Sequence, residues 1–185
     1  SSSFGDFGYD GFLSKVEDDG QTLWLEAFGG ANPEAIYDLT ETPDGGFILV
    51  GSTESYGSML KDVFVIKVDQ NGALEWTNTY GGNDLDEGKS VYIGEDGLLY
   101  LIGYTRSFGL GEADIWLIVI DAQGNELNSY TFGTELNNYG VGIISDGSGH
   151  LIILSNDEIN GYSEQKVAVR KIGLDGSQIW YNYHQ

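Results

Sequence analysis

Residues 44–82 read DGGFILVGSTESYGSMLKDVFVIKVDQNGALEWTNTYGG, and this stretch decides the fold. Two runs within it, Phe47–Val50 and Val63–Ile66, consist of the aliphatic, β-branched and aromatic residues that favour strands. Every residue of both runs is apolar, which indicates strands whose sheet is covered on both faces. The turn Asp69–Gly72 carries Asp early and Gly late, as a type I turn closed by a left-handed residue requires.

The same pattern returns after every 52 residues along the chain, without a gap. The aligned positions are turn glycines, tryptophans and aspartates, each with at most one exception. They are Gly20, Gly72, Gly124 and Gly176; Trp24, Trp76 and Trp180, with Asn128 in the third copy; and Asp10, Asp62 and Asp114, followed by Lys166. A fixed period of this length indicates a repeat architecture, and we interpret the glycines and tryptophans as its structural framework.

Each repeat is predicted to form four short strands. In the repeat 83–134, the predicted strands are Ser90–Ile93, Leu98–Gly103, Asp114–Ile120 and Glu126–Phe132. No segment combines a 3.6-residue period with helix caps, so essentially no helix is expected. Repeated four-stranded units that are buried on both faces are typical of β-propeller blades.

The motif in residues 44–82 resembles the kelch-like, bacterial-type β-propeller repeats of large secreted and surface proteins, and the resemblance covers all 185 residues. It implies inner strands that start near Ile36, Gly88 and Gly140, and a Trp on the outermost strand that packs between blades. It also implies an extracellular or cell-surface location. The residues that break the repeat are where specialisation is expected, and they are Asn128, Ser155, Arg170 and His184.

The chain is predicted to be a single propeller region, 1–185, made of repeats 1–30 (partial), 31–82, 83–134 and 135–185. This division gives about 14 strands, or three and a half antiparallel blades. An open arc of this kind leaves two apolar blade faces bare, and no polar capping repeat is evident. We therefore expect protein partners or further blades to complete the ring, the alternative being a small self-closed propeller with one incomplete blade.

The charge balance excludes several kinds of partner. The chain has 8 Lys and Arg against 29 Asp and Glu, a formal net charge of −21, which argues against binding to nucleic acid or anionic membranes. No run of 18 apolar residues occurs, so no membrane insertion is expected. The absence of Cys excludes disulfides, Cys-ligated metals and a thiol nucleophile.

Few residues suggest a ligand. Asp84, Asp86 and Glu87 place three carboxylates within four residues and form a candidate Ca²⁺ site, although hydrogen bonding between repeats is the favoured explanation of these residues. No other cofactor is expected. Candidate binding residues are Tyr104 and Tyr162, which are off-pattern or in loops, and Arg170, which enters an otherwise apolar strand.

These observations favour a non-catalytic extracellular scaffold that mediates assembly, adhesion or ligand binding. The alternatives are a propeller that binds glycans or small molecules, and a quinoprotein-like propeller enzyme. The enzyme alternative lacks a cofactor-binding constellation and a plausible acid–base pair. The two histidines, His150 and His184, stand in no catalytic motif and are interpreted as structural.

Overall fold

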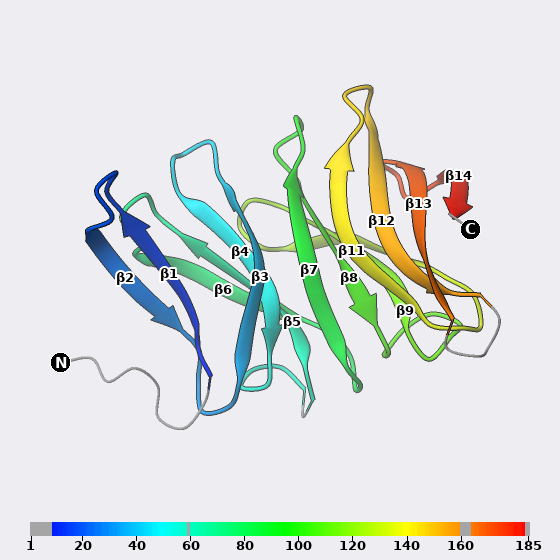
Figure 1. Ribbon diagram of the computed structural model, residues 1–185, viewed down its shortest axis with the longest axis horizontal. Coiled ribbons are helices and arrows are strands. Elements are labelled where there is room, and N and C mark those ends of the chain that lie inside the picture. The colour runs from blue at the N-terminus through cyan, green and yellow to red at the C-terminus, as the bar shows by residue number, and fades with distance from the viewer. Residues whose placement is uncertain (1–8, 59, 160–163, 184–185) are drawn as a thin grey trace.

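The computed structural model describes residues 9–58, 60–159 and 164–183 of the chain (Figure 1). These residues form 14 strands and no helix, which confirms the all-β prediction for this part of the chain. The strands are β1 (Gly11–Val16), β2 (Thr22–Phe28), β3 (Glu34–Glu41), β4 (Phe47–Thr53), β5 (Asp62–Val68), β6 (Leu74–Tyr80), β7 (Asp86–Ile93), β8 (Leu99–Thr105), β9 (Asp114–Ile120), β10 (Glu126–Phe132), β11 (Asn138–Ser145), β12 (His150–Glu158), β13 (Gln165–Gly173) and β14 (Gln178–Tyr183). Within the described ranges there is accordingly no helix that could cross a membrane.

Consecutive strands pair to form separate antiparallel sheets. Strands β3 to β6, β7 to β10 and β11 to β14 form three four-stranded sheets, each in chain order, and β1 pairs with β2. The four-strand unit expected from the repeat is therefore present as an antiparallel sheet. Local turn chemistry explains the hairpins, because Asp69 accepts backbone hydrogen bonds from Asn71 and Ala73 while Gly72 adopts a φ of 83°.

Strands β9 and β10 have the predicted bounds, whereas β7 begins earlier than predicted. It starts at Asp86 rather than Ser90 because Asp86 and Glu87 already pair with Thr105 and Tyr104 of β8, and the Asp86 N–H also donates to Lys61 O at 2.8 Å. The pairing of β7 with β8 also shifts between Gly88 and Ser90, which leaves Lys89 as an unpaired bulge residue. The first residues of β7 are polar and include a bulge, so they do not show the alternation of apolar residues by which a strand is predicted.

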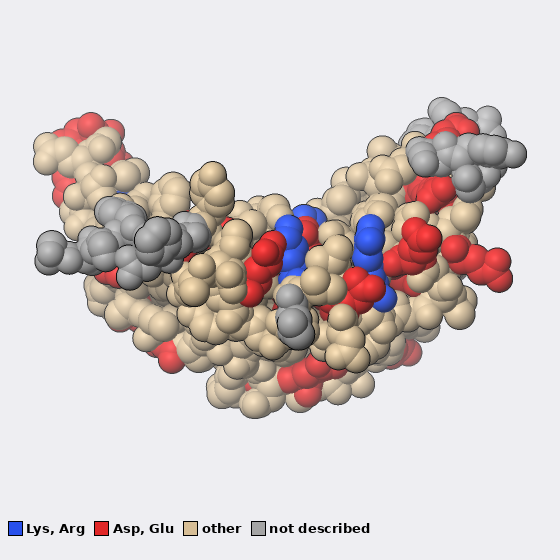
Figure 2. Space-filling model, turned by 90° about the horizontal axis from the view of Figure 1, so that it is seen from below, with Lys and Arg blue, Asp and Glu red and all other residues tan. Residues whose placement is uncertain are grey.

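The sheets stack face to face through three apolar cores. The core between the middle two sheets includes Val50, Val65, Leu101 and Ile118, all almost fully buried. Equivalent cores join β1–β2 to the sheet β3–β6, and β7–β10 to β11–β14. The stack curves, so that the molecule is a crescent with a hollow on one side (Figure 2). We call β3, β7 and β11 the inner strands, since β7 contacts both β3 and β11 where neighbouring sheets converge.

The repeated tryptophans pack against the repeated turn glycines of the next sheet. A Cβ added to Gly72 would lie 2.8 Å from the Trp24 ring, and one added to Gly124 would lie 3.1 Å from the Trp76 ring. At the third junction, where Asn128 replaces Trp, the ring of Tyr130 takes over this contact with Gly176. Trp180, on the last strand, is exposed because the described chain places no sheet beyond it.

Candidate functional site

The inner strands carry bulges whose residues differ from repeat to repeat. The register of β3 shifts between Ile36 and Asp38, as that of β7 does around Lys89, so Tyr37 and Lys89 are the bulge residues. A bulge turns its side chain away from the regular faces of the sheet. Tyr37 and Lys89 occupy the same repeat position on neighbouring strands, and the Lys89 ammonium lies 3.5 Å from the centroid of the Tyr37 ring.

A nearly buried carboxylate, Glu87, lies beside this pair. Its Oε1 is 3.0 Å from Lys61 Nζ and its Oε2 is 2.5 Å from Lys89 Nζ. Tyr37 also reaches this group, since its hydroxyl donates to Oε2 at 3.4 Å. Burial raises the pKa of Glu87, but the hydrogen bonds and charges of Lys89 and Lys61 outweigh it and hold the pKa below its usual value.

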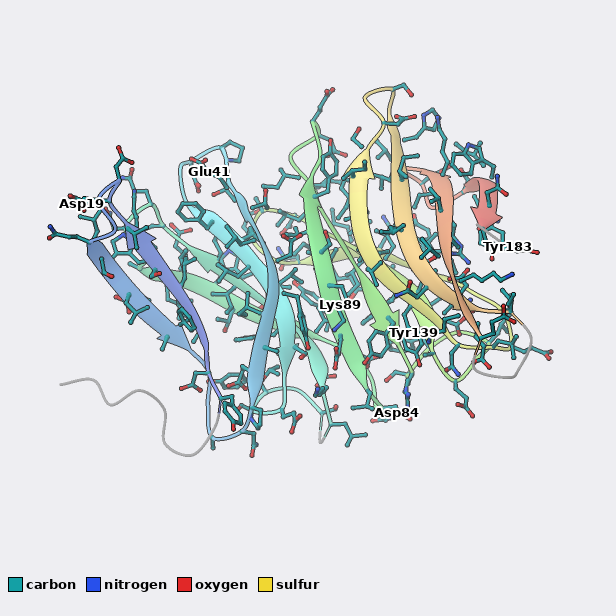
Figure 3. All side chains as sticks on the ribbon, in the orientation of Figure 1. Asp19, Glu41, Asp84, Lys89, Tyr139 and Tyr183 are labelled. Carbon is teal, nitrogen blue, oxygen red and sulfur yellow. The ribbon has the colours of Figure 1, made fainter. Side chains whose placement is uncertain are left out.

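Two further tyrosines extend the cluster toward β11. Tyr104 of β8 packs edge-to-face on Tyr139 of β11, with ring centroids 4.9 Å apart. The Lys89 ammonium lies 5.8 Å from the Tyr104 centroid, so this cation stands between the rings of Tyr37 and Tyr104. Burial and the neighbouring Glu87 carboxylate raise the pKa of Tyr104. We call the whole cluster the central site, and its residues are Tyr37, Lys61, Glu87, Lys89, Tyr104 and Tyr139 (Lys89 and Tyr139 are labelled in Figure 3).

The three carboxylates of the candidate Ca²⁺ site do not converge. Asp86 and Glu87 are neighbours on one strand, so their side chains leave opposite faces of the sheet. Asp86 accepts hydrogen bonds from Gly82 N and Ser107 Oγ, whereas Glu87 binds the two lysines. Asp84 is exposed in the preceding loop (Figure 3). Among the described residues no group of three or more Asp, Glu or His side chains is arranged to hold a metal ion.

The candidate binding residue Arg170 is buried and already paired. Its guanidinium binds Asp157 Oδ2 at 2.5 Å and Ser155 Oγ at 2.6 Å, and it lies 4.3 Å from the Tyr181 ring centroid. These contacts leave Arg170 inside the protein, unavailable to a ligand at the surface. Of the other two candidates, Tyr104 is in the central site, and Tyr162 lies outside the described residues.

A Ser, a His and an Asp meet at the turn before β12, but not as a catalytic triad. Ser148 Oγ and Asp146 Oδ2 both approach the same ring nitrogen of His150, Nδ1, at 3.2 and 3.4 Å. In a triad the Ser and the Asp use opposite ring nitrogens. The Asp146 carboxylate also binds Lys171 Nζ at 2.5 Å, so the cluster fastens the turn to β13. His184 lies outside the described residues.

Comparison with known proteins gives limited likenesses. No protein-family model matches the chain. The regulatory protein FlaEY of Caulobacter vibrioides is 26% identical over 161 residues, and the match covers 74% of this chain and 17% of FlaEY. The chain therefore spans about a sixth of the length of this relative. A crystal structure of the eukaryotic initiation factor covers 95% of this chain and 43% of its own, with a TM-score of 0.49 and 10% identity, a likeness too low to carry an argument.

Sequence reasoning found Tyr104 and Glu87 but missed most of the central site. A signal was present, because the structural positions repeat while the central-site positions do not. Tyr37, Lys89 and Val141 share one repeat position, and Ala35, Glu87 and Tyr139 share another. Three different residues at each position show that these side chains are not required by the repeat fold itself.

Proposed function

We propose that this chain is a non-catalytic interaction scaffold, a run of β-propeller blades whose two end faces pack against further blades of the same kind. The observation that carries this proposal is the apolar character of both end faces. It agrees with the kelch-like resemblance, which adds an extracellular or cell-surface location. The strongly acidic composition keeps such a repetitive β protein soluble in that setting.

The first end face belongs to the last sheet, on the side away from β7–β10. Its residues repeat the ones that are buried between the interior sheets. Leu154 corresponds to Ile102 and is 42% exposed, whereas Ile102 is fully buried. Val167 corresponds to Ile115 and shows the same contrast. Full burial of each such side chain would contribute about 1.5–3 kcal/mol to the stability of an interface. This face therefore has the composition of a surface that packs against another sheet.

The second end face belongs to β1 and β2, on the side away from β3–β6. Phe12 corresponds to Phe64 and is 66% exposed, against 1% for Phe64. Val16 corresponds to Val68 and is likewise exposed where its counterpart is buried. The two end faces are therefore the two halves of the interface that joins the interior sheets. A sheet of the same repeat, from the same polypeptide or from another copy, fits both.

The proposal is tested by measuring the mass of the full natural polypeptide that contains this chain, once denatured and once native. The same measurements are made on two lysine variants. Leu154→Lys charges the first end face, and Leu127→Lys is its control, since Leu127 is similarly exposed (47%) on the outer strand β10. We expect a native mass well above 20.2 kDa, from a longer chain or from assembly. Leu154→Lys should weaken that assembly, or the stability of the longer chain, and Leu127→Lys should not. A native monomer of 20.2 kDa with an unchanged Leu154→Lys variant would refute the proposal.

The binding of a small ligand is the second candidate function, and the central site favours it. The site gathers charged groups and aromatic rings on the inner strands, at positions that the repeat leaves free to vary. The quinoprotein-like enzyme has no comparable support among the described residues. FlaEY is a regulatory protein by name, which is compatible with either a scaffold or a ligand-binding protein.

A further inference from the structure

The central site concentrates positive charge in a protein that has little of it. Three of the eight basic residues, Lys61, Lys89 and Arg106, surround Glu87 and Tyr104. Arg106 is placed there by its backbone, whose N–H donates to Leu85 O at 2.9 Å, two residues before Glu87. Figure 2 shows basic side chains gathered near the middle of the crescent, with acidic ones around them.

The carboxylates of the cluster do not neutralise these cations completely. Glu87 binds both lysines, and Glu54 reaches only Lys61, at 4.0 Å. Glu87 and Glu54 are the carboxylates that come within 4.0 Å of the two lysines in the described structure, and neither forms an ion pair with Arg106. Each ammonium has three N–H donors, and the guanidinium has five. The lysine side chains keep 33% and 23% of their surface exposed, so donors beyond those used by Glu87 remain accessible.

Aromatic rings flank these donors. Tyr37 is 44% exposed and lies directly beneath the Lys89 ammonium. On the other side, Tyr104 and Tyr139 are half-buried and hold each other edge-to-face. A flat ligand can stack on the exposed ring while its charged group meets the cations. Glu87, which is itself nearly buried, holds the ammonium groups of Lys61 and Lys89 in place through its two carboxylate oxygens.

We propose that the central site binds a small monoanion in which a carboxylate is attached to a flat or ring-shaped body. The carboxylate binds Lys89 and Lys61, with Arg106 beside them, and the ring packs on Tyr37. A single carboxylate can accept hydrogen bonds from the donors that Glu87 leaves free. A polyanion is disfavoured because the net charge of −21 repels it at long range. This inference is independent of what covers the end faces.

The test is an NMR titration of the full chain with two carboxylate probes, benzoate and glucuronate, and their neutral counterparts, benzamide and glucose. Saturable shifts of β3, β7 and β8 amides with at least one acid, and none with the neutral counterparts, are expected. Lys89→Gln should weaken binding about tenfold or more, the scale of one lost charge-assisted contact. Lys15→Gln, which removes an exposed lysine from β1, should not change it.

Three results would overturn the inference: no saturable shift with either acid, equal binding by Lys89→Gln, or equal binding of inorganic phosphate, which has no ring. If Lys89→Gln does not fold, Arg106→Gln replaces it, because Arg106 is exposed and makes no ion pair in the described structure. Thermal melts of each variant separate a binding defect from a folding defect. The measurement does not depend on the oligomeric state that tests the scaffold.

Discussion

Replacing Arg170 by Ile is expected to destabilise the protein by about 3–5 kcal/mol, although it restores the residue that the two middle repeats carry. The equivalent positions hold Ile66 and Ile118, both buried. In the last sheet Asp157 is 1% exposed and faces Arg170. Removing the guanidinium leaves this carboxylate buried without its counter-charge, and that cost exceeds the gain from an apolar side chain.

A second substitution should rescue the first. Asp157 occupies the position of Thr53 and Thr105, which are buried in the other sheets. The double variant Arg170→Ile with Asp157→Thr removes both charges, and replacing a buried pair by residues that fit is often neutral or stabilising. We expect its stability to return to within about 1 kcal/mol of wild type.

Urea denaturation at neutral pH measures both effects. Lys166→Ala, which removes a partly exposed cation 3.8 Å from Glu164, is the control and should change stability by less than about 1 kcal/mol. A single variant as stable as wild type would show that the Arg170–Asp157 pair has no net effect on stability.

The second large effect is expected at the junction between the two middle sheets, where Asp86→Asn should stabilise the protein by about 1–3 kcal/mol at neutral pH. Asp62 and Asp86 are at least 98% buried around Gly81, and the Oδ1 atom of each has no hydrogen-bond partner. Burial, together with the charge of Asp86, raises the pKa of Asp62. Two buried carboxylates in proximity therefore oppose folding when both are ionised.

The protein itself contains the proposed variant at the next junction. Asn138 takes the place of Asp86 there, and its Oδ1 accepts from Thr134 N at 2.8 Å, as Asp86 Oδ2 accepts from Gly82 N. An Asn at 86 could therefore keep the contact with Gly82 N through its amide oxygen, place its N–H₂ where the unpartnered Oδ1 now lies, and remove one of the two buried charges.

The pH dependence follows from the raised pKa of Asp62. A carboxyl with a raised folded-state pKa favours the fold below its unfolded pKa, near 3.9, and this contribution is lost as the pH rises through the folded value. The gain from Asp86→Asn should thus be largest at neutral pH and shrink toward pH 4. Asp44→Asn is a control of opposite sign, since hydrogen bonds from Thr42 and Gly46 lower the pKa of Asp44 to about 2.

Denaturation curves between pH 4 and pH 8, with and without millimolar Ca²⁺, check this prediction. If Ca²⁺ stabilises wild type but not Asp86→Asn, a cation rather than a proton compensates the pair, and the candidate Ca²⁺ site would have to be moved from Asp84 and Glu87 to Asp62. Equal stability of the two proteins at every pH would show that the carboxylates do not repel each other.

The number of strands, the four-stranded sheets and the bounds of β9 and β10 were predictable from the amino-acid sequence. This was possible because turn residues such as Gly72 and buried runs such as Phe47–Val50 act within one repeat, where spacing along the chain is spacing in the sheet. It also marked Tyr104, as an aromatic residue off the repeat pattern, and Glu87, as one of three carboxylates within four residues.

The contacts of the residues that depart from the repeat pattern depend on the tertiary structure. Arg170 became a buried partner of Asp157 because β12 and β13 pair with Arg170 opposite Ile153, and its long side chain reaches Asp157 farther along β12. Asp86 and Glu87 separated because neighbouring residues of a strand leave opposite faces. The central site brings together Tyr37, Lys61 and Lys89 from three segments. The bulge in β7 turns the side chain of Lys89 toward Tyr37. Contacts between segments that are distant in the sequence depend on how the sheets stack and on where a bulge occurs. A local sequence pattern does not indicate either.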